Sequence, residues 1–496
     1  MNVNPITRLD YPDLDVIRVE DTYYMVSTTM HFMPGCEILQ SFDLVHWEHV
    51  TYVYETLDHT DAQQLKSGQN IYGQGMWAAS LRYHEGRFCI CFVANDTRKT
   101  YLYTSKKIDG PWKKQLIEGF YHDGSLLFDE DGRNYIVYGN DEIWITELNE
   151  DLTAPKKDGL HRLLVSDHKN PELGYEGSHI QKINGYYYIF LVHSLRDRWM
   201  RTEACFYSDS LEGEFTGGDV LCDDRGYCGQ GVAQGGIVDT PDGKWYAMLF
   251  QDSGAVGRIP ILLPVTWKDH FPFFGQNGHV PEEIEVHSTR PGYIYQPLVG
   301  SDDFCNGLLP RWQFNHDPDP RYYHLDALQG TYTITTREVC TELTQAVNTL
   351  TQRMSYPSCA AEVTVDASAL KEGDVAGLCA LQSCYAAVGI TKHHGKYEVL
   401  MLDKKEDGIL DMTEGTVVES HQMDFRLEAD FCNMKDEARC YYRVNKGDWL
   451  PIGTVHKLYF KLDHFTGCRF GLFCYAAEET GGSACFRDFK YYDVDE

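Results

Sequence analysis

The chain has 496 residues, of which 44 are Lys or Arg and 74 are Asp or Glu, so its formal net charge is −30. Domains usually contain roughly 50 to 250 residues, which predicts two domains or three. The excess of negative charge would repel polyanions and therefore argues against nucleic acid and an anionic membrane surface as partners.

The N-terminus and the cysteines indicate in which cellular compartment the protein is expected. The sequence contains no run of about 18 apolar residues, and its first residues lack the charged-then-apolar layout of a signal peptide. We therefore expect a cytoplasmic protein. The 16 Cys are scattered and form no CxxC pair, which predicts reduced thiols and no cysteine-based metal site.

The local pattern predicts an all-β chain, because short runs rich in Val, Ile, Tyr and Phe are bounded by Gly, Asp and Asn. One hairpin signature, an acidic residue or Asn followed by aromatic residues and an apolar run, occurs five times in the first 290 residues. It starts at Asp21, Glu85, Asp131, Asn184 and Asp242. Repeats of four short strands at roughly 45 to 60 residues are typical of propeller blades, so the sequence predicts a five-bladed β-propeller. A sandwich of unrelated hairpins is the less favoured alternative.

Eight residues before each hairpin start, the repeats carry Asp13, Trp77, Asp123, Glu176 and Gln234. The first strand of each propeller blade lines the central channel, so we expect these five side chains to converge near one end of the axis. Like charges held close in a partly dry channel raise at least one pKa. One carboxylate that activates water and one carboxylic acid that protonates a leaving oxygen are the minimum for glycoside hydrolysis. A third carboxylate would tune the other two, and Trp77 would offer an aromatic face to a sugar ring.

A cation site is the alternative interpretation of the same positions, since three carboxylates and Gln234 could bind Ca²⁺ through oxygen ligands. We favour a substrate pocket, because Trp77 and the Gly-rich neighbours suit an open pocket better than a closed cage.

Several segments resemble, in the same order along the chain, motifs of glycoside hydrolase family 43. They are Tyr11-Pro12-Asp13, Gly75-Met76-Trp77-Ala78, Asp123-Gly124-Ser125-Leu126, Tyr175-Glu176-Gly177-Ser178-His179 and Asp242-Gly243-Lys244-Trp245-Tyr246. The resemblance covers the propeller and extends to the β-sandwich of the β-xylosidase-like members.

The resemblance implies a role for each carboxylate. Asp13 would be the general base, Glu176 the general acid, and Asp123 the carboxylate that raises the pKa of the acid and positions it. The family inverts configuration, which implies room for a water molecule, with the base and acid carboxyls roughly 6.5 to 9.5 Å apart.

The resemblance also implies substrate contacts. Arg258 stands where the family often carries an arginine that binds sugar hydroxyls, and Phe32 and Trp77 would wall the pocket. Blade packing is the alternative for Arg258, and core packing for Phe32. Gln234 stands where many members have a His associated with a central ion, so we expect no required cofactor and no bound metal, with a structural calcium ion as the alternative.

The blade signature stops after residue 295, and the rest of the chain alternates apolar and polar positions, as in Ala361-Glu362-Val363-Thr364-Val365. The sequence therefore predicts a catalytic propeller over residues 1–295 and a jelly-roll-like β-sandwich over 300–496, which resembles the C-terminal domain of two-domain β-xylosidases. This second domain would either bind sugar or cap the pocket and limit it to chain ends.

The sequence thus predicts an exo-acting, inverting glycoside hydrolase that releases a terminal pentose from small oligosaccharides. A β-xylosidase is the favoured activity, and an α-L-arabinofuranosidase is the close alternative. A carbohydrate-binding propeller without catalysis is the alternative of another class, against which the presence of both Asp13 and Glu176 argues. Association into a homo-oligomer stays open.

Overall fold

The computed structural model describes residues 2–462 and 464–493 of the chain. Over these residues the chain consists of β-strands and four short 3-10 helices, with no α-helix. The 3-10 helices are Lys66–Gly68, Gly254–Val256, Leu343–Gln345 and Cys432–Met434. Within the same residues, no helix has the length and apolar character needed to cross a membrane. The predicted all-β class is confirmed.

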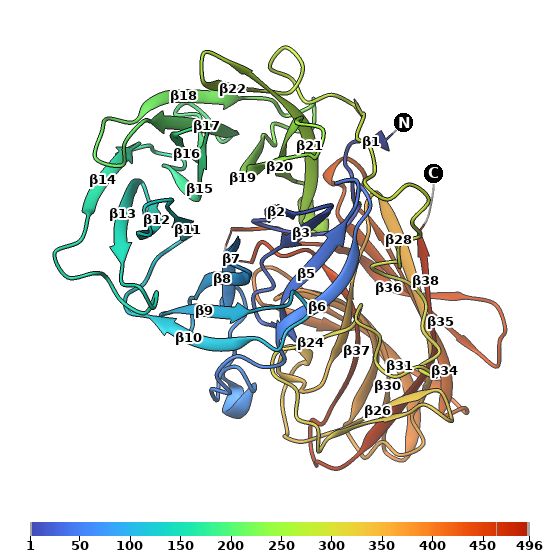
Figure 1. The fold of residues 1–496 in the computed structure, drawn as a ribbon. Helices are drawn as coiled ribbons and strands as arrows, with labels where there is room; N and C mark the ends of the chain where they lie inside the picture. Colours follow the sequence, from blue (N-terminus) through green and yellow to red (C-terminus); the bar gives the residue numbers. More distant parts are fainter. Residues whose placement is uncertain (1, 463, 494–496) are drawn as a thin grey trace.

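Five four-stranded antiparallel sheets are arranged as the blades of a propeller around a central axis (Figure 1). Blade I contains β2 (Asp15–Val19), β3 (Thr22–Val26), β5 (Gly35–Ser41) and β6 (Glu48–Tyr54). Blade II contains β7 (Met76–His84), β8 (Arg87–Ala94), β9 (Lys99–Ser105) and β10 (Lys113–Ile117). Blade III contains β11 (Ser125–Phe128), β12 (Asn134–Asn140), β13 (Glu142–Leu148) and β14 (His161–Ser166). Blade IV contains β15 (Glu176–Ile183), β16 (Tyr186–Ser194), β17 (Arg201–Ser208) and β18 (Thr216–Leu221). Blade V contains β19 (Val232–Asp239), β20 (Trp245–Asp252), β21 (Arg258–Lys268) and β22 (Phe271–Phe274). Each of the five predicted hairpins joins the first and second strands of one blade.

Apolar packing between neighbouring blades closes the ring. Each pair of adjacent blades shares one buried cluster, and the cluster between the first and last blades brings Val16 and Met25 against Met248 and Leu262. Burying apolar area contributes roughly 25 cal/mol per Å², so these clusters are the main force that holds the blades together. The N-terminal β1 (Asn2–Val3) pairs with β23 (Glu283–Ile284) beside blade V.

The second half of the chain forms two packed sheets. The first contains, in spatial order, β32 (Leu410–Met412), β31 (Lys396–Lys404), β30 (Tyr385–His393), β29 (Val375–Leu381), β37 (Arg469–Tyr475), β27 (Leu350–Arg353) and β24 (Gln313–Asn315), and β33 (Thr416–Val418) pairs with β31. The second contains β25 (Tyr323–Asp326), β26 (Thr331–Thr335), β38 (Ser483–Asp493), β28 (Ser358–Asp366), β34 (Gln422–Asp430), β35 (Glu437–Val444) and β36 (Leu450–Lys457). One continuous apolar core lies between them, as expected for a β-sandwich.

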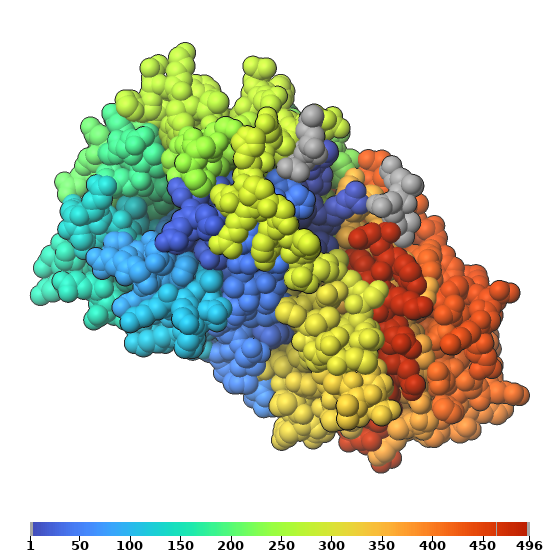
Figure 2. Space-filling view, turned by 45° about the vertical axis from the view of Figure 1, so that its right-hand side comes forward, coloured from blue at the N-terminus to red at the C-terminus, as the bar shows by residue number. Residues whose placement is uncertain are grey.

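The propeller and the sandwich are joined by backbone pairing as well as by side chains. The short propeller strand β4 (Phe32–Met33) adds to the edge of the first sandwich sheet, where it pairs with β24. Arg353 of the sandwich forms a buried ion pair with Glu37 of blade I at 2.8 Å. Figure 2 shows the two parts in contact along a broad face, with the propeller in blue to green and the sandwich in yellow to red. The sandwich is therefore fixed beside the propeller and can contribute side chains to it.

Candidate active site

The five equivalent positions of the repeats lie at the start of the first strands, where the backbone leaves regular β geometry. Asp13, Asp123 and Gln234 have positive φ angles of 50°, 48° and 67°. Such left-handed conformations are uncommon for residues other than glycine and often mark functional sites. In three blades the pairing of the first two strands also shifts register here, beside Met76, Glu176 and Ala233. A bulge re-aims side chains, so the local backbone turns these residues away from the strand pattern.

Asp13 is buried and accepts hydrogen bonds on both oxygens. Oδ1 accepts from Arg258 Nη1 at 2.6 Å and from Gln234 Nε2 at 3.2 Å, while Oδ2 accepts from the Thr28 hydroxyl at 2.6 Å. Arg258 is held from its other side by Asp252, whose oxygen lies 3.1 Å from Arg258 Nε. These contacts fix the position of the Asp13 carboxylate, because every one of them is a donor to a carboxylate oxygen.

Asp252 in turn pairs with Arg201 Nε at 3.0 Å, which links blades IV and V behind Asp13. All three members of this Arg201–Asp252–Arg258 chain are buried, so each charge needs its partner. The chain therefore holds Arg258 rigidly against the Asp13 carboxylate.

Asp123 is buried beside the backbone that follows Glu176. Its Oδ2 accepts a hydrogen bond from the N–H of Gly177 at 3.0 Å. Gly177 has a φ of 64°, and a Cβ at this residue would lie 2.7 Å from the Gln234 side chain. Glycine is therefore required where blades III, IV and V approach one another.

His122 lies between the two carboxylates of blades III and IV. Its Nε2 is 3.6 Å from Asp123 Oδ2 and 3.6 Å from Glu176 Oε2. The negative charge of Asp123 raises the pKa of His122 to about 9, so the imidazole carries a positive charge at neutral pH.

Burial and the negative charges of its neighbours affect the two carboxyls differently. Burial, opposed by His122 and reinforced by the charges of Glu176 and Asp13, raises the pKa of Asp123 to about 6. For Glu176, burial raises the pKa, but His122 and the more distant Arg201 and Arg258 outweigh it, so the net direction is downward.

The end of β12 supports this arrangement. Asn140 Nδ2 donates to Glu176 Oε2 at 2.7 Å, and the N–H of Gly139 donates to the carbonyl of His122 at 3.0 Å. Gly139 has a φ of 141°, and a Cβ there would lie 2.0 Å from the Glu142 carbonyl oxygen. Two successive residues of one strand thus position the acidic side chain and its cationic neighbour.

Atoms of His122, Asp123 and Glu176 that could act as ligands all lie within 4.8 Å of one another. The spacing would suit a metal ion, and the imidazolium would supply positive charge at the same place. Among the described residues, Asp13 lies outside this close group. That separation is compatible with a water molecule between base and acid, although the predicted distance of 6.5 to 9.5 Å stays a prediction.

Aromatic side chains from both domains border the carboxylates. Trp77 lies in an edge-to-face contact with Phe465 of the sandwich, with ring centroids 5.3 Å apart. The Arg258 guanidinium lies 3.9 Å from the centroid of the same Phe465 ring. Phe465 therefore brings the second domain into contact with two of the predicted site residues. Together, Trp77, Phe465 and Arg258 form a wall held by an aromatic and a cation–π contact.

Phe32 lies elsewhere in the contact between the domains. It is buried in β4, and the Arg469 guanidinium of the sandwich lies 3.5 Å from its ring centroid. The structure thus joins Asp13 to Gln234 and Arg258 by hydrogen bonds, and it brings Asp123 and Glu176 together around His122. The charge of Asp13 acts on Asp123, and Trp77 lies beside His122 and Phe465. The prediction that Phe32 walls the pocket stays a prediction.

Below the carboxylates, a second set of charges crosses the channel. Arg82 donates to Asp15 Oδ2 at 2.7 Å, to Ser125 Oγ at 2.7 Å and to the Ile180 carbonyl at 3.2 Å, and His179 lies 3.2 Å from Asp15 Oδ1. Burial raises the pKa of Asp15, but Arg82 and His179 lower it further, so that this pKa is about 2. The Arg82 guanidinium therefore joins blades I to IV beside the propeller axis, a place that we call the hub.

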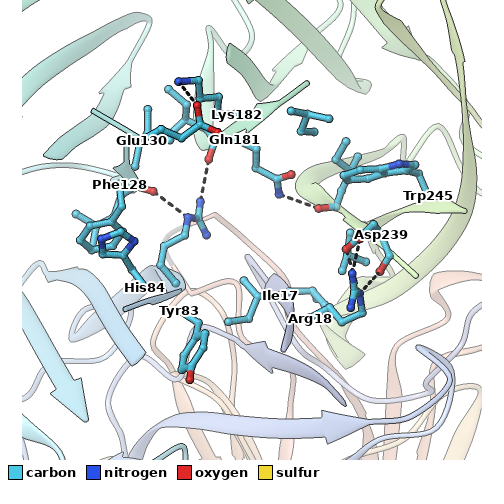
Figure 3. Close-up of a pocket in the computed structure, with 18 residues that line it drawn as sticks. Ile17, Arg18, Tyr83, His84, Phe128, Glu130, Gln181, Lys182, Asp239 and Trp245 are labelled. Atoms are coloured by element: carbon cyan, nitrogen blue, oxygen red, sulfur yellow. Dashed lines mark hydrogen bonds and ion pairs between the residues drawn. The ribbon is translucent and has the colours of Figure 1, made fainter. Parts of the chain in front are cut away.

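A cavity of about 450 Å³ opens at the opposite end of the first strands. Figure 3 shows that its lining comes from different blades, with Arg18 beside Asp239, Lys182 beside Glu130, and Tyr83, Phe128 and Trp245 around it. None of the predicted catalytic residues lines this cavity. The two mouths of the channel therefore differ in chemistry, and only one carries the three carboxylates.

Sequence reasoning did not find every residue of the site. His122, Asn140, Arg201, Asp252 and Phe465 were not predicted. His122 would have been the easiest of them to find from the sequence, because it directly precedes Asp123 and no other repeat has a histidine at that place. Phe465 gives no repeat signal at all, since it belongs to the other domain.

A five-bladed propeller with three carboxylates at one mouth, joined to a β-sandwich, defines the architecture of a glycoside hydrolase. The model of glycosyl hydrolases family 43 matches residues 3–272. The model of the β-xylosidase C-terminal concanavalin A-like domain matches residues 301–492. The chain belongs to glycosyl hydrolase family 43.

Individual relatives agree with this assignment. The chain is 26% identical to a β-xylosidase of Formosa agariphila, over 99% of this chain and 89% of that protein. It is 24% identical to a non-reducing end α-L-arabinofuranosidase of Bacteroides ovatus, over 83% of this chain and 79% of the relative. A solved structure of a bifunctional GH43-CE protein of Bacteroides eggerthii is 41% identical, with a TM-score of 0.92. It covers all of this chain, which spans 64% of that longer protein.

Proposed function

We propose that this glycoside hydrolase is an exo-acting β-xylosidase that removes the terminal xylose from short xylo-oligosaccharides with inversion of configuration. The observation that carries the proposal is the meeting of Asp13, Asp123 and Glu176 at one mouth of the channel. The names of the relatives support the pentose, since they include β-xylosidases.

In the proposed reaction, Asp13 takes a proton from a water molecule as that water attacks the anomeric carbon. Glu176 donates a proton to the glycosidic oxygen, so the leaving sugar departs as a neutral alcohol. The Arg258 guanidinium and the Gln234 amide orient Asp13, and Asn140 orients Glu176. Holding both groups in place removes much of the entropic cost of bringing water, acid and sugar together.

The aromatic wall supports cleavage at chain ends. Trp77 and Phe465 stand against each other beside Arg258, and Phe465 comes from a domain that is fixed by β4 and the Arg353–Glu37 ion pair. A wall on this side of the carboxylates would stop a polysaccharide from running through the site. The second domain would then act as a cap that limits the enzyme to terminal residues.

An α-L-arabinofuranosidase is the second candidate, because a relative over 83% of this chain carries that name. The two activities are separated by comparing kcat/KM for an aryl β-xyloside and an aryl α-L-arabinofuranoside, with the anomer of the first product followed by NMR. A preference for the arabinofuranoside would replace the xylosidase proposal. A product that retains its configuration would refute the inverting mechanism.

A non-catalytic carbohydrate-binding propeller is the candidate of another class. Asp13→Ala and Glu176→Ala should each abolish the hydrolysis of xylobiose, while the thermal unfolding temperature stays near that of the wild type. Turnover near the wild-type rate in either variant would remove the proposed mechanism. Binding without turnover in the wild type would favour the non-catalytic alternative.

We also propose that catalysis needs no metal ion. The support is the hub, where the Arg82 guanidinium and His179 neutralise Asp15 between four blades. Gln234 is occupied by its hydrogen bond to Asp13 and by its N–H, which donates to Glu203 at 2.7 Å. Positive charge at the axis is thus supplied by side chains.

A further inference from the structure

Among the residues that the structure describes, His122 is the cationic side chain that lies between the carboxyls of Asp123 and Glu176. Its Nε2 is equally distant from Asp123 Oδ2 and Glu176 Oε2, at 3.6 Å from each. Both distances exceed a hydrogen bond, and this buried nitrogen atom has no hydrogen-bond partner among the described residues. His122 therefore acts on the two carboxyls mainly through its charge.

The position of His122 is imposed by the fold. Its carbonyl is fixed by the Gly139 N–H, and its ring stands edge-on to Trp77 with centroids 6.0 Å apart. The next residue, Asp123, has the left-handed backbone described above. The ring is about one-fifth exposed, so it lies at the border of the pocket rather than in the core.

The charged side chains around His122 and its two neighbouring carboxyls come from four blades. Blade III contributes Asp123, blade IV contributes Glu176 and the more distant Arg201, blade I contributes Asp13, and blade V contributes Arg258. Arg258 is committed to Asp13 and Asp252, and Arg201 to Asp252. His122 is therefore the nearest positive charge that the acid can use.

A general acid has to satisfy two conflicting demands. It must be protonated near neutral pH, and it must also be strong enough to release its proton to the leaving oxygen. Burial and the Asp123 charge both oppose the ionisation of Glu176, whereas the cations near Glu176 favour it and set the net direction of its pKa downward. Acting alone, burial and the Asp123 charge would make the proton too hard to remove, so an opposing positive charge is needed.

We propose that the imidazolium of His122 is a positioning residue that sets the proton-donating strength of Glu176. It stands between Glu176 and Asp123 and stabilises the charge that Glu176 gains when its proton passes to the glycosidic oxygen. His122 keeps its own protons throughout this step. The inference rests on the proposed roles of Asp13 and Glu176.

The test is the pH dependence of kcat/KM for His122→Gln, which removes the charge and keeps a polar side chain. The alkaline limb, which reports the ionisation of the general acid, should move upward by about 1 to 3 pH units, the size of shift that one close charge produces. Hydrolysis of xylobiose should fall more than that of an aryl xyloside with a good leaving group, because only the first needs a strong acid.

Two matched variants separate charge from structure. His122→Lys restores a positive charge, so its alkaline limb should stay closer to that of the wild type than that of His122→Gln. His84→Gln removes a histidine from the opposite mouth of the channel and should leave the profile unchanged. An unmoved or downward limb in His122→Gln would overturn the proposal, as would a His122→Lys limb that moves equally far.

A second measurement does not depend on turnover. An NMR titration of the histidine rings should assign to His122 a pKa well above the ordinary value, and this pKa should fall in Asp123→Asn. A His122 ring that titrates near 6.5 would refute the charge on which the inference depends. If the wild type hydrolyses no glycoside, the proposed function fails while the titration still decides the state of His122.

Discussion

Replacing Arg82 by Met should destabilise the propeller far more than the loss of an ordinary surface ion pair. Arg82 donates to Asp15, Ser125 and Ile180, so one guanidinium joins blades I, III and IV to its own blade II. Methionine fills a similar volume but offers no donor. The variant would leave Asp15, whose side chain is 1% exposed, with His179 and the backbone N–H of Leu81 as partners but without the guanidinium charge.

The magnitude follows from the Asp15 carboxyl. Its pKa is lowered from 3.8 to about 2, and each pKa unit corresponds to about 1.4 kcal/mol, so the folded environment favours the ionised form by roughly 2 kcal/mol. Removing one partner of a buried pair also leaves an uncompensated charge, which typically costs about 3 to 5 kcal/mol. We expect a loss of about 3 to 5 kcal/mol in the free energy of unfolding at pH 7.

The assay is urea unfolding at a series of pH values, and the sign of the pH dependence is the sharper readout. In the wild type the folded pKa of Asp15 is depressed, so its stabilisation is present above pH 4 and is lost as the pH falls toward 2. In Arg82→Met the buried carboxyl should have a raised pKa, so the variant should regain stability as the pH falls from 7 to 5. Arg133→Met, which breaks the exposed pair with Asp131, should cost less than about 1 kcal/mol. A cost for Arg82→Met as small as that of this control, or stability that falls between pH 7 and 5, would refute the reasoning.

Three further predictions concern activity. Asp123→Asn should move the alkaline limb of the kcat/KM profile downward, because it removes a negative charge that interacts with Glu176, and an unmoved or upward limb would contradict the tuning role. Phe465→Ala should raise KM for xylobiose about tenfold with a smaller change in kcat, because a ring that packs on Trp77 and Arg258 would also border the bound sugar, and one lost contact of about 1.4 kcal/mol corresponds to a factor of ten; an unchanged KM measured by steady-state kinetics would remove Phe465 from the pocket. Dialysis against EDTA should leave kcat and the unfolding temperature unchanged, and recovery of lost activity by added Ca²⁺ would refute the metal-free site.

The repeat made the propeller and its main carboxylates predictable from sequence. Each blade uses the same hairpin between its first two strands, so a count of eight residues from five hairpins reached Asp13, Asp123 and Glu176 together. The structure adds the physical reason for the constant offset. The equivalent residues lie at the strand starts, where left-handed backbone or a bulge turns the side chain out of the strand pattern.

The partners of these carboxylates were not predictable in the same way. Arg258 begins the third strand of blade V, Arg201 begins the third strand of blade IV, and Asn140 ends the second strand of blade III. The two arginines share a place in the repeat, but the third strands of the other blades begin with Gly35, Lys99 and Glu142, so the repeat does not single out an arginine there. Phe465 reaches the site through tertiary packing between residues about 390 positions apart from Trp77, a distance over which sequence pattern carries no information.

The distribution of charge explains why the acidic composition said so little about function. Along the axis, three carboxylates each have a cation from another blade: Arg258 from blade V lies against Asp13, His122 from blade III lies against Glu176, and Arg82 from blade II lies against Asp15. Asp123 shares His122 with Glu176. Only a few of the 74 acidic residues take part in these contacts, so the net charge of −30 reflects mainly the rest of the molecule. A symmetric scaffold thus supplies equivalent positions for the acids, and unequal cations from single blades give each acid a different role. Substitutions that alter catalysis while preserving the fold should therefore be sought at the cation that borders the pocket, His122, rather than at Arg82, which joins the blades.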